Sequence, residues 1–210
     1  MKINKIFLAV NYFSFKYFFD KLIAFLLLIL ISPFLLFISL LILIILGKPI
    51  FFIQERPGFK CRPFKIIKFR TMKNLYAEKG DLMDDKFRIH KFGQFLRSTS
   101  IDELPALINI IKGEMSFIGP RPLLMKYLQL YNKEQIKRHY VKPGMTGLAQ
   151  INGRNLISWE KKFQYDLYYV KKINFILDLK ILIITFKKVF LRIGINSKNK
   201  FSANEFNGNN

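Results

Sequence analysis

The sequence contains a single cysteine, Cys61, so no disulfide can form within the chain, and a reducing compartment suits it. It also has only two histidines, His90 and His139, and no cysteine–histidine spacing typical of a zinc site. A Walker P-loop and the Gly-x-Gly-x-x-Gly dinucleotide fingerprint are both missing. We therefore interpret Cys61 as a structural thiol, and we find little support for zinc chemistry or for the usual serine or cysteine hydrolases.

Acidic residues are scarce as well: 14 Asp and Glu face 35 Lys and Arg, which gives a formal net charge of +21. Such a charge predicts an anionic partner, namely nucleic acid, phospholipid or a phosphorylated substrate. Hydrophobic residues nevertheless make up 51% of the chain and 23 residues are Phe, which argues against a nucleic-acid-binding module. The combination favours a membrane surface with anionic lipids, where each Lys or Arg contributes about 1 kcal/mol.

The longest hydrophobic run, residues 22–46, contains no charged residue. As a straight helix it would measure about 37 Å, enough to cross the hydrocarbon core of a bilayer, which is about 30 Å thick. The run is too long for a secretory signal peptide and lacks a small-residue cleavage site. One interpretation is therefore a single transmembrane helix.

Ser32 and Pro33, near the middle of this run, favour a second interpretation. Pro33 removes a backbone donor and clashes with the preceding turn, so a kink is expected there, and the Ser32 hydroxyl can bond a backbone group that Pro33 leaves free. Both flanks of the run are basic and so favour the cytoplasmic side. We expect a re-entrant membrane helix that is broken at Ser32-Pro33 and returns to the same side. The basic residues are Lys2, Lys5, Lys16 and Lys21 before the run, and Lys48, Arg56, Lys60, Arg62, Lys65 and Lys68 after it.

The rest of the chain predicts an α+β, mostly helical fold, so that the whole is a monotopic membrane protein with a small β-hairpin and interfacial amphipathic helices. Aromatic and β-branched runs on both sides of Arg56-Pro57-Gly58 predict the hairpin within residues 48–72. The remaining segments are a polar, partly acidic loop at 73–88, helices at 104–112, 123–140 and 159–172, and an ordered loop rich in turn residues at 141–155.

Residues 173–193 are apolar but are interrupted by Asp178, Lys180 and further basic residues, which a spanning helix would not carry near its middle. We interpret them as an amphipathic helix in the membrane interface, with a buried core helix as the alternative. The expected organisation is an N-terminal segment with the re-entrant helix (1–47), a cytoplasmic catalytic domain that includes the interfacial C-terminal helix (48–195), and a polar, disordered tail (196–210).

Asp102 and Glu103 are adjacent acids in this basic chain. One interpretation is a capping box, Ser100-x-x-Glu103, at the start of a helix, where the helix dipole also favours acids. Pro105 disfavours helical geometry at Leu104, so the pair is alternatively expected on an irregular turn before the helix proper. A helix N-terminus keeps a carboxylate ionised at neutral pH, as a nucleophile or a metal ligand requires.

Basic residues near Gly, Pro or Thr turns accompany the acid pair. Arg binds phosphate oxygens with two parallel hydrogen bonds, so we expect the group to form a diphosphate site, although each member alone is explained as well by a solvated surface charge. A carboxylate approaches an anionic diphosphate only when the charge is neutralised, which Mg²⁺ achieves with hard oxygen ligands. The residues are Lys68, Arg70, Arg97, Arg121, Arg138, Lys142 and Arg154.

Three segments resemble one known family: ERPG with KFRTM, RSTSIDELPALINIIKGEMSFIGPRP, and KPGMTGLAQINGRN. On these residues the chain is similar to the bacterial small monotopic phosphoglycosyl transferases, which transfer a sugar phosphate to a polyprenyl phosphate. The likeness covers nearly the whole chain. The segments IDELPALINIIKGEMSFIGPRPLL and NGRNLISWEKKFQYDLYYVKK bring it closest to the members that transfer phospho-N,N'-diacetylbacillosamine in protein glycosylation.

The resemblance implies a role for each site residue. Asp102 would attack the β-phosphorus of a UDP-sugar, expel UMP and form a phosphosugar-aspartyl intermediate, which polyprenyl (undecaprenyl) phosphate would then attack in a ping-pong course. Glu103 would hold Mg²⁺ and orient the phosphates. Candidates for phosphate or nucleotide contacts are Lys68, Arg97, Arg121 and Arg154. The implied partners are the UDP-sugar, the lipid phosphate, anionic lipids of the bacterial inner membrane at its cytoplasmic face, and downstream glycosyltransferases, without nucleic acid.

Two alternatives stay open. The same reaction with another UDP-hexose or UDP-N-acetyl sugar would serve O-antigen, capsule or exopolysaccharide synthesis, and no motif identifies the sugar directly. A basic membrane-bound adaptor without catalysis would account for the charge, but not for the acid pair, the Pro-Arg-Pro turn or the Gly-Met-Thr-Gly loop.

Overall fold

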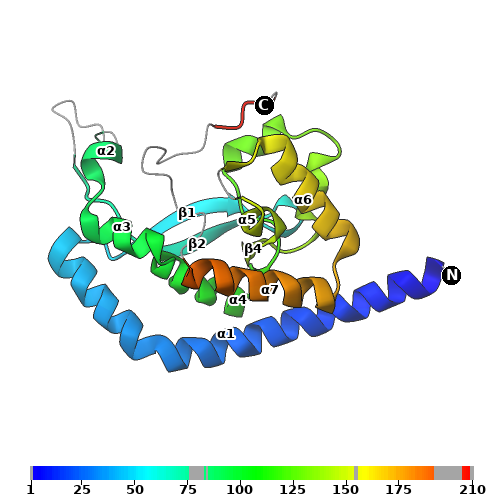
Figure 1. The fold of residues 1–210 in the computed structure, drawn as a ribbon, viewed down its shortest axis with the longest axis horizontal. Coiled ribbons are helices and arrows are strands. Elements are labelled where there is room, and N and C mark those ends of the chain that lie inside the picture. The colour runs from blue at the N-terminus through cyan, green and yellow to red at the C-terminus, as the bar shows by residue number, and fades with distance from the viewer. Residues whose placement is uncertain (1, 76–82, 84, 154–155, 192–204, 209–210) are drawn as a thin grey trace.

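The computed structural model describes residues 2–75, 83, 85–153, 156–191 and 205–208, and these form a mostly helical protein arranged along one long N-terminal helix (Figure 1). Within these residues there are two two-stranded sheets. One is the antiparallel hairpin of β1 (Phe51–Pro57) and β2 (Pro63–Phe69), and the other is the parallel pair of β3 (Ser116–Ile118) and β4 (Gly144–Thr146). The expected α+β fold with a small hairpin is confirmed.

Short helices and 3₁₀ turns connect these sheets to the longer helices. The elements are η1 (Phe59–Cys61), α2 (Asp85–Arg88), α3 (Lys91–Ser98), η2 (Ile101–Ala106), α4 (Leu107–Lys112), η3 (Met125–Leu130), η4 (Gln135–Tyr140), α5 (Leu148–Ile151), α6 (Trp159–Lys172) and α7 (Phe175–Phe190). The continuous helix expected at 123–140 is wrong, because two separate 3₁₀ turns form there. The side chain of Asn132 accepts hydrogen bonds from the backbone amides of Glu134 (2.9 Å) and Gln135 (2.8 Å). These bonds interrupt the chain after η3 and initiate η4 as a separate turn.

Helix α1 (Lys2–Leu46) is long and apolar enough to cross a membrane, and most of its large apolar side chains are exposed, which is compatible with a monotopic membrane protein. It stays helical through Ser32-Pro33, and its axis bends part-way along (Figure 1). Pro33 cannot donate to the carbonyl of Ile29, and the Ser32 hydroxyl donates to that carbonyl instead, at 2.8 Å. The expected hydrogen bond of Ser32 to a backbone group that Pro33 leaves free is confirmed, and the re-entrant break stays a prediction.

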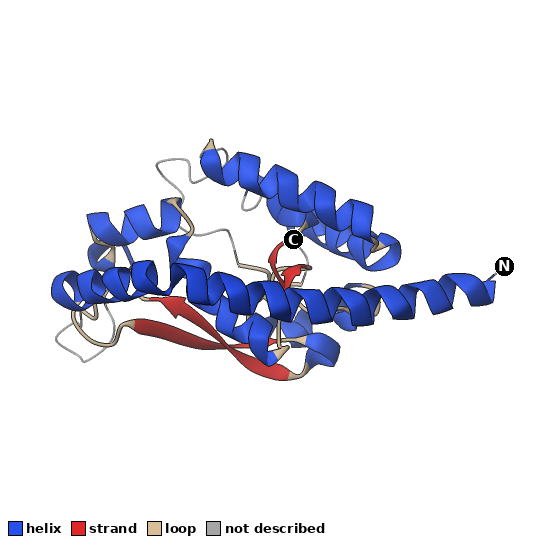
Figure 2. Cartoon of the chain, turned by 90° about the horizontal axis from the view of Figure 1, so that it is seen from below, coloured by secondary structure: helices blue, strands red, loops and turns tan. Residues whose placement is uncertain are grey.

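The hairpin lies along one side of α1 (Figure 2), and its strand β2 is held against α4. Phe64 and Ile66 of β2 bury against Leu107 and Ile110 of α4. Asn109, which is fully buried, accepts a hydrogen bond from one β2 backbone amide at 3.0 Å and donates to a β2 carbonyl at 2.7 Å. Because a bond of this kind fixes register, β2 presents its last residues to the turn that precedes α4.

A buried polar cluster joins α1 to α7. Lys16 lies 2.8 Å from Asp178 of α7 and 3.6 Å from Asp20, and all three side chains are nearly inaccessible. The hydroxyls of Tyr12 and Tyr169 donate to Asp178 at 2.6 Å and 2.7 Å, and Asp20 accepts from a β3 serine at 2.6 Å. Asp178, expected to be a charge facing the interface, is therefore a buried ion partner that fixes α7 across α1.

The opposite face of α7 is apolar and exposed. Ile176, Ile183, Phe186 and Phe190 are between 59% and 89% exposed, and they recur at helical spacing along one stripe. A fully buried core helix, the alternative above, is therefore wrong. An exposed apolar stripe on a helix that also carries several Lys residues is the pattern of a helix that lies in a membrane interface.

The C-terminal tail is ordered at the part that the structure describes. Phe206 is 3% exposed and packs among Tyr127, Tyr131, Trp159 and Phe163. The expectation of a disordered tail is wrong for residues 205–208, because this aromatic side chain completes a core cluster. Residues 196–204 and 209–210 of the tail, 192–195 before it, and 76–82 and 84 of the acidic loop lie outside the described residues.

Candidate active site

The acid pair lies on η2, a 3₁₀ turn that leads directly into α4. Ser100 adopts a left-handed conformation (φ 58°) and its side chain makes no capping bond, so the capping box is wrong. Pro105 sits inside the turn, one residue before the end of η2. The alternative expectation, an irregular turn before the helix proper, is confirmed, and it holds Asp102 and Glu103 beside the end of β2.

Glu103 is bound by two cations at one oxygen. Lys68 Nζ, from β2, and Arg121 Nη2, from the Gly-Pro-Arg-Pro turn, each lie 2.7 Å from Glu103 Oε1. Burial alone would raise the pKa of Glu103, but the charges and hydrogen bonds of Arg121 and Lys68 outweigh it and hold that pKa well below its usual range. Glu103 therefore stays ionised across the physiological pH range.

Asp102 behaves in the opposite way. Burial, followed by the negative charge of Glu103, raises the pKa of Asp102 to about 6, against the lowering effect of Lys68, Arg121 and Arg97. A pKa of about 6 is compatible with the expectation that this carboxylate is ionised at neutral pH, although burial raises the pKa and brings it closer to neutrality. Adjacent carboxyls with pKa values pushed apart are typical of groups with different roles in one site.

Three of the expected phosphate-binding cations gather at the acid pair. Lys68 and Arg121 contact Glu103 directly. Arg97, at the end of α3, donates from Nε to the Thr71 hydroxyl at 2.8 Å, and its charge lowers the pKa of Asp102. Arg154 lies outside the described residues. The three placed cations outnumber the two acids, which suits the binding of an anionic ligand.

The other cations of the expected diphosphate site have structural roles. Arg70 donates to the carbonyls of Leu46, at 2.6 Å, and of Gly47, and so caps the C-terminal end of α1. Lys142 lies over the ring of Tyr17, 4.2 Å from its centroid. Proximity to turn residues in the sequence did not distinguish these cations from those at the acid pair.

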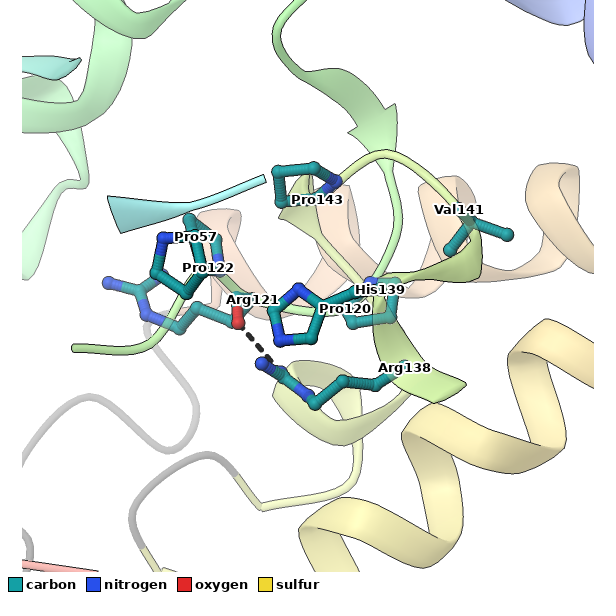
Figure 3. A pocket seen from close by; sticks show the side chains of 8 residues that line it. All are labelled: Pro57, Pro120, Arg121, Pro122, Arg138, His139, Val141 and Pro143. Atoms are coloured by element: carbon teal, nitrogen blue, oxygen red, sulfur yellow. Dashed lines mark hydrogen bonds between the residues drawn. The ribbon is translucent and has the colours of Figure 1, made fainter. Parts of the chain in front are cut away.

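Arg138 is also structural, but it acts on the site. Its Nη2 donates to the backbone carbonyl of Arg121 at 2.7 Å (Figure 3), and its guanidinium is paired with Asp166 of α6 at 2.7 Å and 3.0 Å. Both side chains are almost fully buried. The narrow, proline-lined pocket around these groups has no interior room for a ligand. Arg138 and Asp166 therefore support the turn that aims Arg121 at Glu103.

Glycines let this turn approach the β4 strand closely. Gly119 and Gly144 lie backbone to backbone: a Cβ on Gly144 would come within 2.1 Å of the Gly119 nitrogen, and one on Gly119 within 2.4 Å of the Lys142 carbonyl. The Gly119 amide donates to the Thr146 carbonyl at 2.9 Å. The two glycine-containing motifs identified in the sequence thus form one packed unit behind Arg121.

The donor set of the site fits Mg²⁺ rather than a closed protein metal centre. No group of three or more His, Cys, Asp or Glu side chains comes together among the described residues. Asp102 and Glu103 supply hard carboxylate oxygens, and Mg²⁺ is commonly held by one or two carboxylates together with substrate phosphates. Both cations bind Oε1 of Glu103, so Oε2 is the oxygen available to a metal.

Comparison with known proteins places this geometry in a family. A family model described as bacterial sugar transferase matches residues 11–192. Over 193 residues the chain is 50% identical to the uncharacterized sugar transferase EpsL of Bacillus subtilis, with 92% of this chain and 96% of that protein covered. It is 41% identical over 187 residues to the UDP-glucose:undecaprenyl-phosphate glucose-1-phosphate transferase of Klebsiella pneumoniae.

That second alignment covers 82% of this chain but 39% of the Klebsiella protein. The galactosyl transferase CpsE of Streptococcus agalactiae is 40% identical over 163 residues, which is 70% of this chain and 36% of that protein. The chain thus spans nearly the whole of the Bacillus relative, and between a third and two fifths of the length of the other two.

The pKa of Asp102 gives a first prediction. If the reaction uses the ionised carboxylate, kcat/KM is constant above about pH 7 and falls about tenfold per unit once the pH drops below about 6. Glu103 adds no step there, since its pKa is far lower. The measurement is the pH dependence of kcat/KM for the sugar nucleotide. Lys68→Met removes a cation that lowers the Asp102 pKa, so its profile should shift to higher pH; a wild-type profile flat down to pH 4 would contradict the assignment.

The support of Arg121 by Arg138 gives a second prediction. Arg138→Lys keeps a positive charge near Asp166 but loses the bond to the Arg121 carbonyl, so kcat/KM should fall by about 10- to 100-fold, as expected for a lost hydrogen bond of a charged group. Displacement of Arg121 should also move the acid limb of the pH profile to higher pH. Lys137→Arg, at the exposed neighbour, is the matched control. An unshifted pH profile would mean that Arg138 serves stability alone.

Proposed function

We propose that this chain, which belongs to the bacterial sugar transferase family, moves a sugar 1-phosphate from a UDP-sugar to polyprenyl phosphate, such as undecaprenyl phosphate, and releases UMP. The observation that carries the proposal is the pair of unlike carboxylates on η2: Glu103 is bound by Lys68 and Arg121, whereas Asp102 is partly buried and has a raised pKa. An adaptor would have no use for this arrangement.

In the proposed first step, an ionised Asp102 oxygen attacks the β-phosphorus of the UDP-sugar. A bond forms between this oxygen and phosphorus, and the bond to the bridging oxygen breaks, so that UMP leaves with the electron pair. In the second step a phosphate oxygen of polyprenyl phosphate attacks the same phosphorus, and Asp102 leaves as a carboxylate. A poorly solvated carboxylate whose pKa lies about one unit below neutral pH suits both steps, because it is ionised yet reactive.

The cations of the site neutralise the diphosphate that Asp102 must approach. Arg121 and Lys68 are held by Glu103 in fixed positions, and Arg97 is held by Thr71, so each presents its charge without reorganisation. Glu103 would hold Mg²⁺ through its second oxygen, next to Asp102. When bound, Mg²⁺ would withdraw charge from the phosphate oxygens.

For the sugar, we propose N,N'-diacetylbacillosamine. Support comes from the likeness of residues 101–124 and 152–172 to family members with that substrate. The relatives whose names state a sugar are glucose and galactose transferases. UDP-glucose and UDP-galactose are therefore the competing substrates, and with them exopolysaccharide rather than protein glycosylation as the pathway that downstream glycosyltransferases would complete.

We further propose that α1 enters the cytoplasmic face of the bacterial inner membrane and returns to it. Support comes from the basic residues on both flanks of the apolar run, from Pro33 inside α1 and from the bend of the α1 axis (Figure 1). The buried cluster of Lys16 with Asp178 keeps the N-terminal half of α1 against the catalytic domain, which a helix that crosses the membrane alone would not require.

UMP release by the purified protein in detergent tests the reaction. With Mg²⁺, polyprenyl phosphate and a panel of UDP-N,N'-diacetylbacillosamine, UDP-glucose and UDP-galactose, the wild type should release UMP with one sugar strongly preferred. Asp102→Asn should reduce release to background, because an amide is a poor nucleophile. The control is Glu55→Gln, which also replaces a carboxylate by an amide, at an exposed position of β1. Absence of release with every sugar, from folded protein, would favour the adaptor.

Accessibility of the chain from the periplasm tests the topology. In a Cys61→Ser background, single cysteines introduced at Lys5 and at the exposed Lys133 should both stay unlabelled by an impermeant maleimide in spheroplasts, and both should react once the cells are lysed. A helix that returns to its starting side keeps both positions cytoplasmic. Labelling at position 5 alone in intact spheroplasts would establish a spanning helix instead.

A further inference from the structure

A groove of about 430 Å³ lies between α5, α6 and α7, away from the acid pair. Its floor is apolar and is formed by Leu148, Ile151, Leu177, Ile181 and Ile184. The volume falls within the range of about 300–1,000 Å³ that is usual for small-molecule sites. None of the residues that form this floor takes part in the site described above.

The wall of the groove that α5 forms is attached to the turn that carries Arg121. This helix begins directly after Gly147, whose backbone lies against that of Gly119, so closely that a Cβ on Gly147 would come within 2.1 Å of the Gly119 carbonyl oxygen. Gly119 starts the turn that carries Arg121 to Glu103. One wall of the groove is therefore attached to the phosphate-binding cations.

The groove also borders the proposed membrane face. Leu177 and Ile184 line the groove, and Ile176 and Ile183, the preceding residues on the same helix, belong to the exposed apolar stripe. Lys180, which lies between Leu177 and Ile184 along α7, also lines the groove, and its side chain is exposed. An ammonium at such a position attracts phosphate-bearing lipids from an anionic surface. The groove thus lies between the exposed apolar stripe of α7 and α5, the helix that begins directly after the Gly147–Gly119 contact.

From this placement we propose that the groove binds the first isoprene units of polyprenyl phosphate, with the phosphate directed toward Arg121 and Asp102. The inference rests on the proposed function. A UDP-sugar is too polar for the apolar floor, whereas a hydrocarbon chain gains free energy from leaving water there. A lipid whose chain lies in the groove enters from the membrane side and needs no path through the site that the nucleotide occupies.

Filling the groove tests the proposal. Ile184→Trp enlarges a partly buried side chain of the floor, and Ile183→Trp makes the same change on the exposed stripe. For Ile184→Trp we expect an undiminished single-turnover burst of UMP without lipid, and a KM for polyprenyl phosphate raised by at least about tenfold through the lost apolar contacts. Ile183→Trp should change neither. An intact burst with an unchanged KM in Ile184→Trp would overturn the inference.

Photo-crosslinking of the wild type decides the question where Ile184→Trp does not fold. A polyprenyl phosphate with a diazirine in its first isoprene units should label Tyr165 or Tyr168, which border the groove, and excess phosphatidylglycerol should not compete. Labelling confined to α1 and the exposed stripe of α7, or competition by phosphatidylglycerol, would refute the inference. A wild type that gives no UMP burst with any sugar would instead refute the proposed function, and the crosslink would still report on the groove.

Discussion

The carboxylate of Glu103 carries two cations on one oxygen, and the arrangement of the candidate site depends on this contact. It joins segments that are far apart in the chain: β2 through Lys68, η2 through Glu103 itself, and the Gly-Pro-Arg-Pro turn through Arg121. The same contact separates the two acids electrostatically. The cations stabilise the charge of Glu103 and so keep its pKa low. Burial and the negative charge of Glu103 then raise the pKa of Asp102.

The surrounding structure holds the partners of Glu103 in place. Asn109 bonds β2 to α4 and so fixes the strand that ends near Lys68. Arg138 and Asp166 form a buried pair that holds the backbone of Arg121. Removal of one member of such a pair would leave an unpaired buried charge, which is far more costly than loss of a surface ion pair. The partners of Glu103 are therefore positioned by buried polar contacts, one through the neutral Asn109 and one through the Arg138–Asp166 ion pair.

Local patterns in the sequence predicted the hairpin, the turn before α4 and the acid pair of Asp102 and Glu103, whereas the choice of Lys68, Arg97 and Arg121 among the nearby cations came from the family resemblance. The local patterns did so because turn residues and strand runs act over a few positions. The sequence patterns did not separate Arg70 and Arg138 from the cations at the acid pair, because tertiary packing decides which acid or carbonyl pairs with an Arg. They also missed Asp166, an acid among the aromatic residues of α6, and Phe206, whose burial depends on a cluster assembled from remote segments.

The buried cluster between α1 and α7 has a consequence for biosynthesis. Tyr12 and Asp178, which share a hydrogen bond, are separated by 166 positions in the chain. At a synthesis rate of about 5–20 residues per second, Lys16 and its neighbours leave the ribosome roughly ten to thirty seconds before their partner exists. During that interval the apolar helix is already available to the membrane, while its ionic contacts are unmade. The contacts between α1 and the rest of the protein are therefore completed late, only after α7 has been synthesised. A nascent chain truncated before α7 would contain α1 but lack the ion pair and hydrogen bonds to Asp178.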